Sequence, residues 1–326
     1  MPVDIDPEVA QWVEMLKSPS VDDRLVAVKS LQHLGEDTAI DALIEALKDD
    51  NSMVQSIAVT ALWELANPVA VPALLECLSS PHAEVYEETL SALKELVAPD
   101  DLLKLLDYLQ QDNEQVQVSI LILLRKIHDA QSLPYVMPFF ESESLVLREA
   151  SVTTLRYLNQ VVRCEPALAL AKDPAPEVRR AAVLTLGHLA DEAIVPLLCE
   201  VLTQDTDWQV RRNASQSLDL LASPASVKAL EQALKDEHWQ VRKFTARALQ
   251  KVGTPEILPS LIQALSDEYS DVRRDAAVAL GNLGHADALP ALQQTLDDPD
   301  IDVRIFSERA IKKIKETLSS ASGSEV

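Results

Sequence analysis

Histidine and cysteine, the side chains best suited to metal binding and to nucleophilic or acid–base chemistry, are scattered in this sequence of 326 residues. The three cysteines, with no CxxC pair among them, are Cys77, Cys164 and Cys199. The histidines lack the spacing of metal ligands, and the sequence has no HExxH, GxSxG, P-loop or dinucleotide-binding motif. We therefore expect no metal site, no cofactor and no catalytic residue. His188 is the one histidine worth testing for catalysis, against the alternative of a solvated surface residue.

Arginine has the clearest pattern in the chain. A Val-Arg pair recurs at steps of 32, 31, 31 and 31 residues, as Val178-Arg179, Val210-Arg211, Val241-Arg242, Val272-Arg273 and Val303-Arg304. Further steps of 31 residues toward the N-terminus reach Arg148, Gln117, Tyr86, Gln55 and Arg24. Ten units thus share one register, with a single-residue insertion near residues 205–208. Such a repeat predicts stacked supersecondary units.

Each unit predicts a pair of helices. Apolar residues lie one position before the arginine and three, seven and ten after it, which is one stripe of an α-helix. In one unit these residues are Val178, Ala182, Leu186 and Leu189. Glycine with a positive φ is expected to end this helix at Gly35, Gly253 and Gly284. A second helix follows, with proline tolerated in its first turn, at Pro72, Pro134, Pro196, Pro259 and Pro290.

An aspartate lies six residues before the arginine position in many units. Proline, then aspartate, then Val-Arg at these spacings resembles the signature of HEAT repeats, from about Pro7 to Leu318. The resemblance implies a ladder of hydrogen bonds between neighbouring units, and an arginine fork can bridge groups from two turns. The expected ladder residues are Asp173, Arg179, Asp205, Arg211, Asp236, Arg242, Asp267, Arg273, Asp298 and Arg304. The ladder should weaken where Gln55, Tyr86 and Gln117 replace arginine.

The fold class expected is all-α: a right-handed α-solenoid of about ten 31-residue HEAT-like helix pairs. We expect an N-terminal extension over residues 1–6, one solenoid over residues 7–318 that is most regular from 165 to 318, and a disordered tail over residues 319–326. Such a chain has no central cavity. Its main asset is a long concave surface lined by the arginine-bearing helices.

The charge of the chain disfavours several classes of function. It has 29 basic and 52 acidic residues, a net charge of −23, which repels nucleic acids and anionic membranes. No apolar run reaches the ~18 residues of a membrane span, and the residues after Met1 do not form a signal peptide. Together with the dispersed cysteines, these features predict a cytoplasmic protein.

The segment Val178–Leu189 also resembles the phycobilisome-lyase-type subclass of HEAT-like repeats, which is abundant in cyanobacteria. Members of that subclass include chromophore-lyase subunits, adaptors for phycobilisome degradation and a partner of iron–sulfur carriers. The resemblance implies a phycobiliprotein or an iron–sulfur carrier as the partner, and it does not separate these roles.

A basic row is the first candidate partner-binding feature. It follows the ladder arginines in the C-terminal half and consists of Arg180, Arg212, Lys243 and Arg274, with Arg247 beside Lys243. Residues 1–163 have 11 basic and 27 acidic residues, whereas residues 164–326 have 18 and 25. A basic strip on an acidic body would select an acidic protein patch. The alternative is that these cations pair with carboxylates of the next unit.

Aromatic residues are the second feature. Trp208 and Trp239 occupy the same position in consecutive units, so we expect an aromatic step beside the basic row, and Trp63 is a third candidate on the N-terminal concave face. The alternative is that each indole covers the end of its own helix. In the fourth arginine-type helix, Val118 and Ile122 stand where solvent-facing residues are expected. Either a bend of the solenoid covers them, or a partner or a second copy does.

Three functions remain open. The first, which we favour, is a non-catalytic scaffold or adaptor that binds a protein along its concave face. The second is a subunit of a bilin chromophore lyase, in which Arg180, Arg212 and Lys243 would bind propionates; such subunits often work as heterodimers. The third is a helical-repeat DNA glycosylase, which the acidic N-terminal half disfavours. Whether the protein is an enzyme is left open by the sequence.

Overall fold

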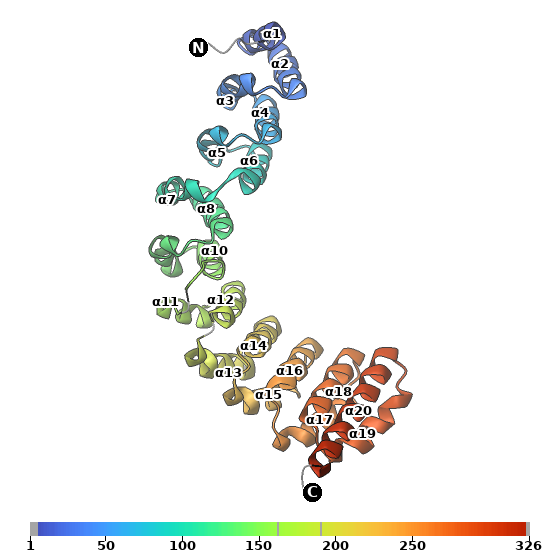
Figure 1. Ribbon diagram of the computed structural model, residues 1–326. Helices are drawn as coiled ribbons and strands as arrows, with labels where there is room; N and C mark the ends of the chain where they lie inside the picture. The colour runs from blue at the N-terminus through green and yellow to red at the C-terminus, as the bar shows by residue number, and fades with distance from the viewer. Residues whose placement is uncertain (1–5, 162, 190, 324–326) are drawn as a thin grey trace. The chain divides into compact units, whose positions relative to one another are not determined.

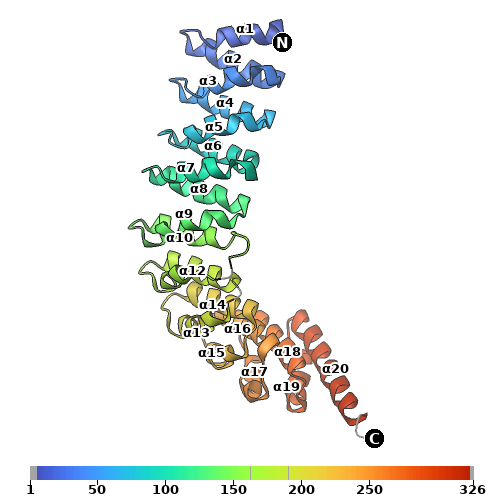
Figure 2. The ribbon, with the colours of Figure 1, turned by 60° about the vertical axis from the view of Figure 1, so that its left-hand side comes forward.

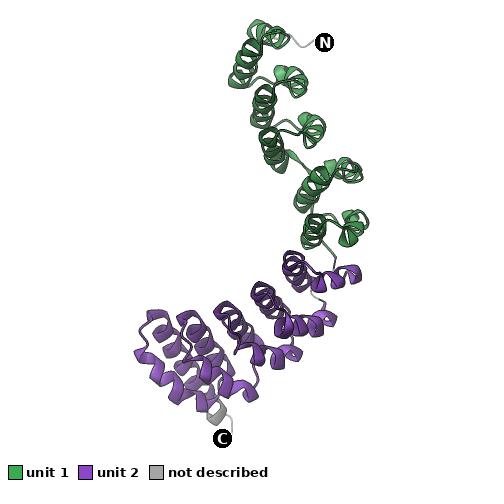
Figure 3. Ribbon diagram, turned by 180° about the vertical axis from the view of Figure 1, so that it is seen from behind, with its two compact units in different colours: residues 1–160 green, residues 161–326 purple. Residues whose placement is uncertain are grey.

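The computed structural model describes residues 6–161, 163–189 and 191–323, and within them the regular structure is entirely helical (Figure 1). The chain divides into two compact units, residues 1–160 and residues 161–326 (Figure 3). The boundary between the units follows Gln160, which has a φ of +64°, and the single solenoid over residues 7–318 stays a prediction. The sequence did not indicate this boundary, because the 31-residue register continues across it.

Unit 1 contains five helix pairs, which stack in chain order (Figure 2). Its odd-numbered helices are α1 (Pro7–Met15), α3 (Ile40–Ala46), α5 (Val71–Cys77), α7 (Leu102–Leu109) and α9 (Leu133–Val136). Its even-numbered helices, which contain the arginine position, are α2 (Val21–Leu34), α4 (Ser52–Leu65), α6 (Ala83–Leu96), α8 (Glu114–Ile127) and α10 (Leu145–Leu155).

Unit 2 also contains five pairs. Its odd-numbered helices are α11 (Glu165–Leu168), α13 (Val195–Gln204), α15 (Val227–Ala233), α17 (Leu258–Ala264) and α19 (Leu289–Gln294). Its even-numbered helices are α12 (Pro176–His188), α14 (Trp208–Leu221), α16 (Trp239–Val252), α18 (Ser270–Leu283) and α20 (Ile301–Gly323). The even-numbered helices pack side by side in one layer, on the inner side of the curve of this unit (Figure 1). The inserted residue falls where α13 has ten residues and α15 and α17 have seven.

Short 3-10 helices complete the connections in both units. They are η1 (Asp37–Ala39), η2 (Pro68–Ala70), η3 (Pro99–Asp101), η4 (Ala130–Ser132), η5 (Met137–Glu141), η6 (Ala169–Lys172), η7 (Glu192–Ile194), η8 (Pro224–Ser226), η9 (Pro255–Ile257), η10 (Ala286–Ala288) and η11 (Thr295–Asp297). The five prolines of the second helix lie in first turns, as expected, where no hydrogen bond is lost.

The apolar stripe of the even-numbered helices forms the core between the two layers. Val178, Ala182 and Leu186 are fully buried, and Leu189 is 4% exposed. Each stripe contacts its own partner helix and the helix pair of the neighbouring repeat. Burial is therefore continuous within each compact unit, although each helix pair is small.

The helix-ending position takes the left-handed conformation in several units, as expected for Gly35 (φ +64°) and Gly284 (φ +71°). The expectation for Gly253 is wrong, because its φ is −56°. A Cβ at Gly253 would lie 2.7 Å from the main-chain oxygen of Leu249, so glycine there permits a close approach. The same position in other units has a positive φ without glycine, at Ala66, His128 and Ala222.

The C-terminal segment differs from expectation. Disorder was predicted from residue 319, but α20 continues to Gly323, and residues 324–326 lie outside the described residues. Ser319 and Ser320 donate hydrogen bonds from Oγ to the main-chain oxygens of Lys315 and Thr317. The segment lacks an apolar stripe, which is why its sequence did not indicate a helix.

Candidate protein-interaction surfaces

The ladder arginines bind the carboxylate of the next unit with two nitrogens. Arg211 donates from Nε to Oδ2 of Asp236 at 2.6 Å and from Nη2 to Oδ1 at 3.0 Å, and from Nη1 to the main-chain oxygen of Asp205 at 2.9 Å. The same pattern joins Arg24 to Asp49, Arg179 to Asp205, Arg242 to Asp267 and Arg273 to Asp298. Each arginine therefore binds the main-chain oxygen six residues before it, in the turn that precedes its helix, and also binds the aspartate of the next repeat.

The aspartates of the ladder also shape the turn that contains them. Oδ1 of Asp236 accepts the main-chain N–H of His238 at 2.8 Å, and Oδ1 of Asp173 accepts that of Ala175 at 2.8 Å. Arg304, in the last unit, donates from Nη1 to the main-chain oxygen of Asp298 at 2.5 Å.

The ladder is interrupted in unit 1. Gln55 and Gln117 keep only the turn bond, from Nε2 to the main-chain oxygens of Asp49 at 2.7 Å and Gln111 at 2.8 Å. The aspartate position of the following unit is Ser80 after Gln55 and Ser142 after Gln117. The hydroxyl of Tyr86 lies 3.0 Å from Oγ of Ser119, on the next even-numbered helix. Replacement of arginine by glutamine thus keeps the turn and removes the ion pair between units.

Most cations of the basic row pair with carboxylates of this chain, mainly those of the neighbouring repeat. Nε of Arg180 lies 3.2 Å from Oδ1 of Asp207, and Nζ of Lys243 lies 2.8 Å from Oδ2 of Asp271. Arg274 also contacts Asp271, at 2.8 Å. Arg180 and Lys243 thus pair with the next repeat, as in the alternative considered, whereas Arg274 pairs within its own helix. The hydrogen bonds from Arg180 and Lys243 lower the pKa of Asp207 and of Asp271 respectively.

Two further residues of this face share a buried carboxylate. Nε of Arg247 lies 3.3 Å from Oδ2 of Asp219, and Nζ of Lys251 lies 2.7 Å from Oδ1. The guanidinium of Arg247 is therefore held against α14, although its side chain is 58% exposed.

Arg212 differs from the rest of the row. Within the described residues it has no carboxylate within 4.0 Å, and it donates from Nε and Nη2 to Oδ1 of Asn213 at 3.2 and 2.9 Å. Its guanidinium lies 5.6 Å from the ring centroid of Trp208. Burial, and then the positive charge of Arg180, lower the pKa of Arg212. The charge of Asp207 raises this pKa from a longer distance, but no described carboxylate pairs directly with this half-buried cation, which leaves it able to donate to a carboxylate of a partner.

The aromatic step contains two residues that sequence reasoning missed. Trp208 stacks on His238, with ring centroids 3.6 Å apart and an interplanar angle of 12°. Trp239 stacks on Tyr269 at 4.9 Å and 12°. His238 lies 6.5 Å from Trp239, so the four rings follow the N-terminal ends of α14, α16 and α18. The available signal was the residue just before the tryptophan position, which is aromatic in the next unit in both cases.

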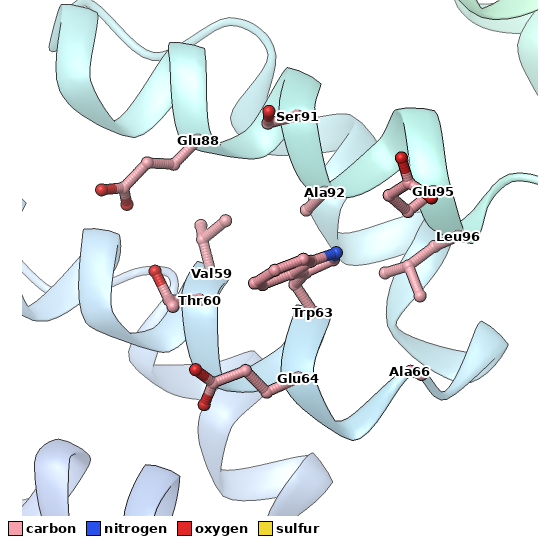
Figure 4. A pocket seen from close by; sticks show the side chains of 10 residues that line it. All are labelled: Val59, Thr60, Trp63, Glu64, Ala66, Glu88, Ser91, Ala92, Glu95 and Leu96. Atoms are coloured by element: carbon pink, nitrogen blue, oxygen red, sulfur yellow. The ribbon is translucent and has the colours of Figure 1, made fainter.

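Trp63 lies apart from this row, in unit 1. It is 45% exposed and borders a hollow of about 820 Å³ between α4 and α6 (Figure 4). Val118 and Ile122, the remaining sequence candidates, are half-buried on α8, which packs against α7 and α10. Neighbouring helices of the same unit thus cover part of the surface for which a partner or a second copy was considered.

The groups considered for chemistry are dispersed. No group of three or more His, Cys, Asp or Glu able to hold a metal occurs in the described part of the chain. His188 is exposed, with Nδ1 2.8 Å from the main-chain oxygen of Leu184. Burial, and to a smaller extent the charge of Glu76, raises the pKa of the Cys77 thiol to about 11. Among the described helices, none has the length and apolar character needed to cross a bilayer.

The helix pairs, their buried stripes and the arginine–aspartate ladder define an α-helical repeat protein. Residues 9–94, 164–238 and 227–312 match the family described as HEAT repeats, which is more than half of the chain. The chain therefore belongs to the HEAT-repeat family. Residues 95–163, which include α8 and part of the interrupted ladder, lie outside these matches. No curated protein matches the chain.

Solved structures of other proteins share this fold. One is an engineered protein, target OR497 of the Northeast Structural Genomics Consortium, with a TM-score of 0.54 and 22% identity over 95% of this chain and 99% of that chain. Another comes from a study in which Kap95p binding induces the switch loops of RanGDP to adopt the GTP-bound conformation. Its TM-score is 0.59 at 15% identity, over 95% of this chain and 52% of that chain. At these identities the likeness shows the fold alone.

Proposed function

We propose that this protein is a non-catalytic scaffold or adaptor that binds a protein partner along the layer of even-numbered helices. The observation that carries the proposal is Arg212, a half-buried cation beside Trp208 that has no carboxylate partner among the described residues. Tryptophan and arginine are enriched among residues that dominate binding energies, and an acidic group of a partner would supply the direct ion pair that Arg212 does not make within the described residues.

The partner-binding surface of unit 2 is then narrower than the sequence suggested. Arg180, Lys243, Arg247 and Arg274 contact carboxylates of the chain itself, so they orient the surface and limit its charge. Arg212 with Trp208 and its stacked neighbour His238 form the part of the row that retains binding capacity.

The nature of the partner is suggested by resemblance. The resemblance of the repeat sequence to the phycobilisome-lyase-type subclass favours a cytoplasmic phycobiliprotein or an iron–sulfur carrier as the partner. A dimer or heterodimer is part of the same proposal. The alternative, a bilin lyase subunit, requires cations for the propionates. Arg180 and Lys243 already bind Asp207 and Asp271, which favours the scaffold over the lyase.

The test compares the full-length protein with Arg212→Glu and with Lys228→Glu. Lys228 is exposed on α15, in the other layer, so both variants make the same change of charge. Binding of a purified phycobiliprotein and of an iron–sulfur carrier would be measured by calorimetry, with circular dichroism to show that each variant is folded. We expect Arg212→Glu to lose binding by about tenfold or more and Lys228→Glu to retain it. Equal binding by all three proteins would contradict the proposal, and bilin absorbance with transfer of bilin to the apoprotein would establish the lyase instead.

A further inference from the structure

The hollow at Trp63 is built by the C-terminal halves of α4 and α6. Val59, Thr60, Trp63 and Glu64 line it from α4, Ala66 lines it from the position just after α4, and Glu88, Ser91, Ala92, Glu95 and Leu96 line it from α6 (Figure 4). In Figure 4 the indole of Trp63 lies in the centre, with carboxylates on several sides of it. The hollow is therefore an aromatic and apolar floor with an acidic rim.

One position of the repeat differs between this hollow and two closely packed helix pairs of unit 2. In unit 2 this position is Asp219 in α14 and Gln250 in α16, but Gly187 in α12 and Gly281 in α18, where the neighbouring helix lies close. A Cβ at Gly187 would lie 2.7 Å from Cα of Ser217, and one at Gly281 would lie 2.9 Å from Cα of Ala310. In unit 1 the position is Trp63, and the residue facing it on α6 is the small Ala92. The indole is 45% exposed at this point, and no described side chain fills the hollow beside it.

Two of the three rim glutamates accept hydrogen bonds from uncharged side chains. Glu64 accepts a hydrogen bond from Nε2 of Gln32 at 3.0 Å, and Glu88 accepts one from the hydroxyl of Ser56. Lys126 donates to the main-chain oxygen of Glu95 at 2.5 Å. Among the described residues, none of the three carboxylates has an ion pair within 4.0 Å, whereas most carboxylates on the even-numbered layer of unit 2 are paired.

We infer that this hollow binds a protein segment that presents a lysine or arginine side chain next to apolar residues. The cation would lie over the face of Trp63 and reach the glutamates, while its aliphatic stem would contact Val59 and Leu96. A volume of about 820 Å³ exceeds that of one side chain, so flanking residues of the segment would enter as well. The inference rests on the proposed scaffold function and gives it a second surface, of opposite preference to that at Arg212.

A short labelled peptide tests the inference on the full-length protein. The probe contains two lysines flanked by leucines, and a matched peptide has glutamates in place of the lysines; binding is measured by fluorescence anisotropy at 150 mM salt, an ionic strength at which distant charges are screened. We expect the lysine peptide to bind and the glutamate peptide not to bind. Trp63→Ala, and separately the triple variant Glu64→Gln/Glu88→Gln/Glu95→Gln, should each weaken binding by about tenfold.

A second triple variant controls for general charge. Asp41→Asn/Glu76→Gln/Asp107→Asn removes three exposed carboxylates from α3, α5 and α7 of the same unit and should change affinity by less than about twofold. Equal losses in both triple variants, or binding of the lysine peptide unchanged by Trp63→Ala, would overturn the inference. So would competition by spermidine at the same concentration as the peptide, since the hollow would then be a polyamine site. Arg212→Glu should leave peptide binding unchanged. A failure of peptide binding at Trp63 would therefore not decide the test of partner binding at Arg212.

Discussion

Arg273 holds both carboxylate oxygens of Asp298, with Nε 2.7 Å from Oδ2 and Nη2 2.8 Å from Oδ1, and so joins α18 to the turn before α20. The aspartate is nearly buried, and its Oδ1 also accepts the main-chain N–H of Asp300 at 2.9 Å. One carboxylate thus stabilises the local turn and the packing of two consecutive repeats.

This pair makes the stability of unit 2 depend on pH. The hydrogen bond from Arg273 holds the pKa of Asp298 below its ordinary value. Because the lower pKa belongs to the folded state, the stabilisation is complete above the unfolded pKa of about 3.9 and is lost as pH falls through the folded pKa. We expect Asp298→Asn to lower the free energy of unfolding at pH 7 by roughly 2 kcal/mol. Below about pH 4 the difference from the unmodified protein should shrink. Denaturant titrations at several pH values measure this; a difference that is constant down to pH 2 would contradict it.

The interrupted ladder of unit 1 can be restored. Gln55 already makes the turn bond, and Ser80 occupies the position 25 residues later that aspartate takes beside Arg211 and Arg242. We expect Gln55→Arg with Ser80→Asp to stabilise α4 and the following turn by about 1 kcal/mol more than the sum of the single changes. Hydrogen exchange of residues 52–65 in the four proteins of the cycle measures the coupling. If the effect of the double change equals the sum of the two single changes, the introduced side chains do not form an ion pair between these repeats.

The arginine register predicted the helix pairs because one side chain both closes a turn and spans to the next unit, so its spacing reports the repeat directly. Contacts between side chains of adjacent units were harder to predict. Trp208 and Trp239 were expected to form one aromatic step, but each stacks on a residue from the following unit, His238 or Tyr269. That choice depends on rotamers and on the offset between helices, which a periodicity does not contain. Likewise, the charge of Arg180 could be read from the sequence, whereas its neutralisation by Asp207 required the geometry.

The left-handed helix ends provide a stability prediction. Ala222 follows α14 with a φ of +48°, a conformation that costs a residue with a Cβ about 1 kcal/mol or more. Ala222→Gly should therefore raise the free energy of unfolding by about 0.5–1 kcal/mol, and Ala229→Gly, within α15, should lower it by about as much. Thermal unfolding of both variants measures the contrast. A destabilised Ala222→Gly would show that the Ala222 methyl matters more than the backbone.

The close approach of α12 and α14 gives the last prediction. A Cβ at Gly187 would overlap Oγ of Ser217 and lie 2.7 Å from its Cα, and Ser217 donates a hydrogen bond to the main-chain oxygen of Val183 at 2.8 Å. Gly187→Ala must therefore push the helices apart and weaken that bond, at a cost of about 2–3 kcal/mol. Gly35→Ala is the informative comparison. Its Cβ would meet nothing within 4 Å, so its cost, about 1 kcal/mol, comes only from the positive φ. Denaturant unfolding should show a larger loss of stability for Gly187→Ala than for Gly35→Ala. The reverse order would mean that α12 and α14 adjust their spacing freely. Such freedom would contradict the close packing at Gly187, with which the open hollow at Trp63 is contrasted.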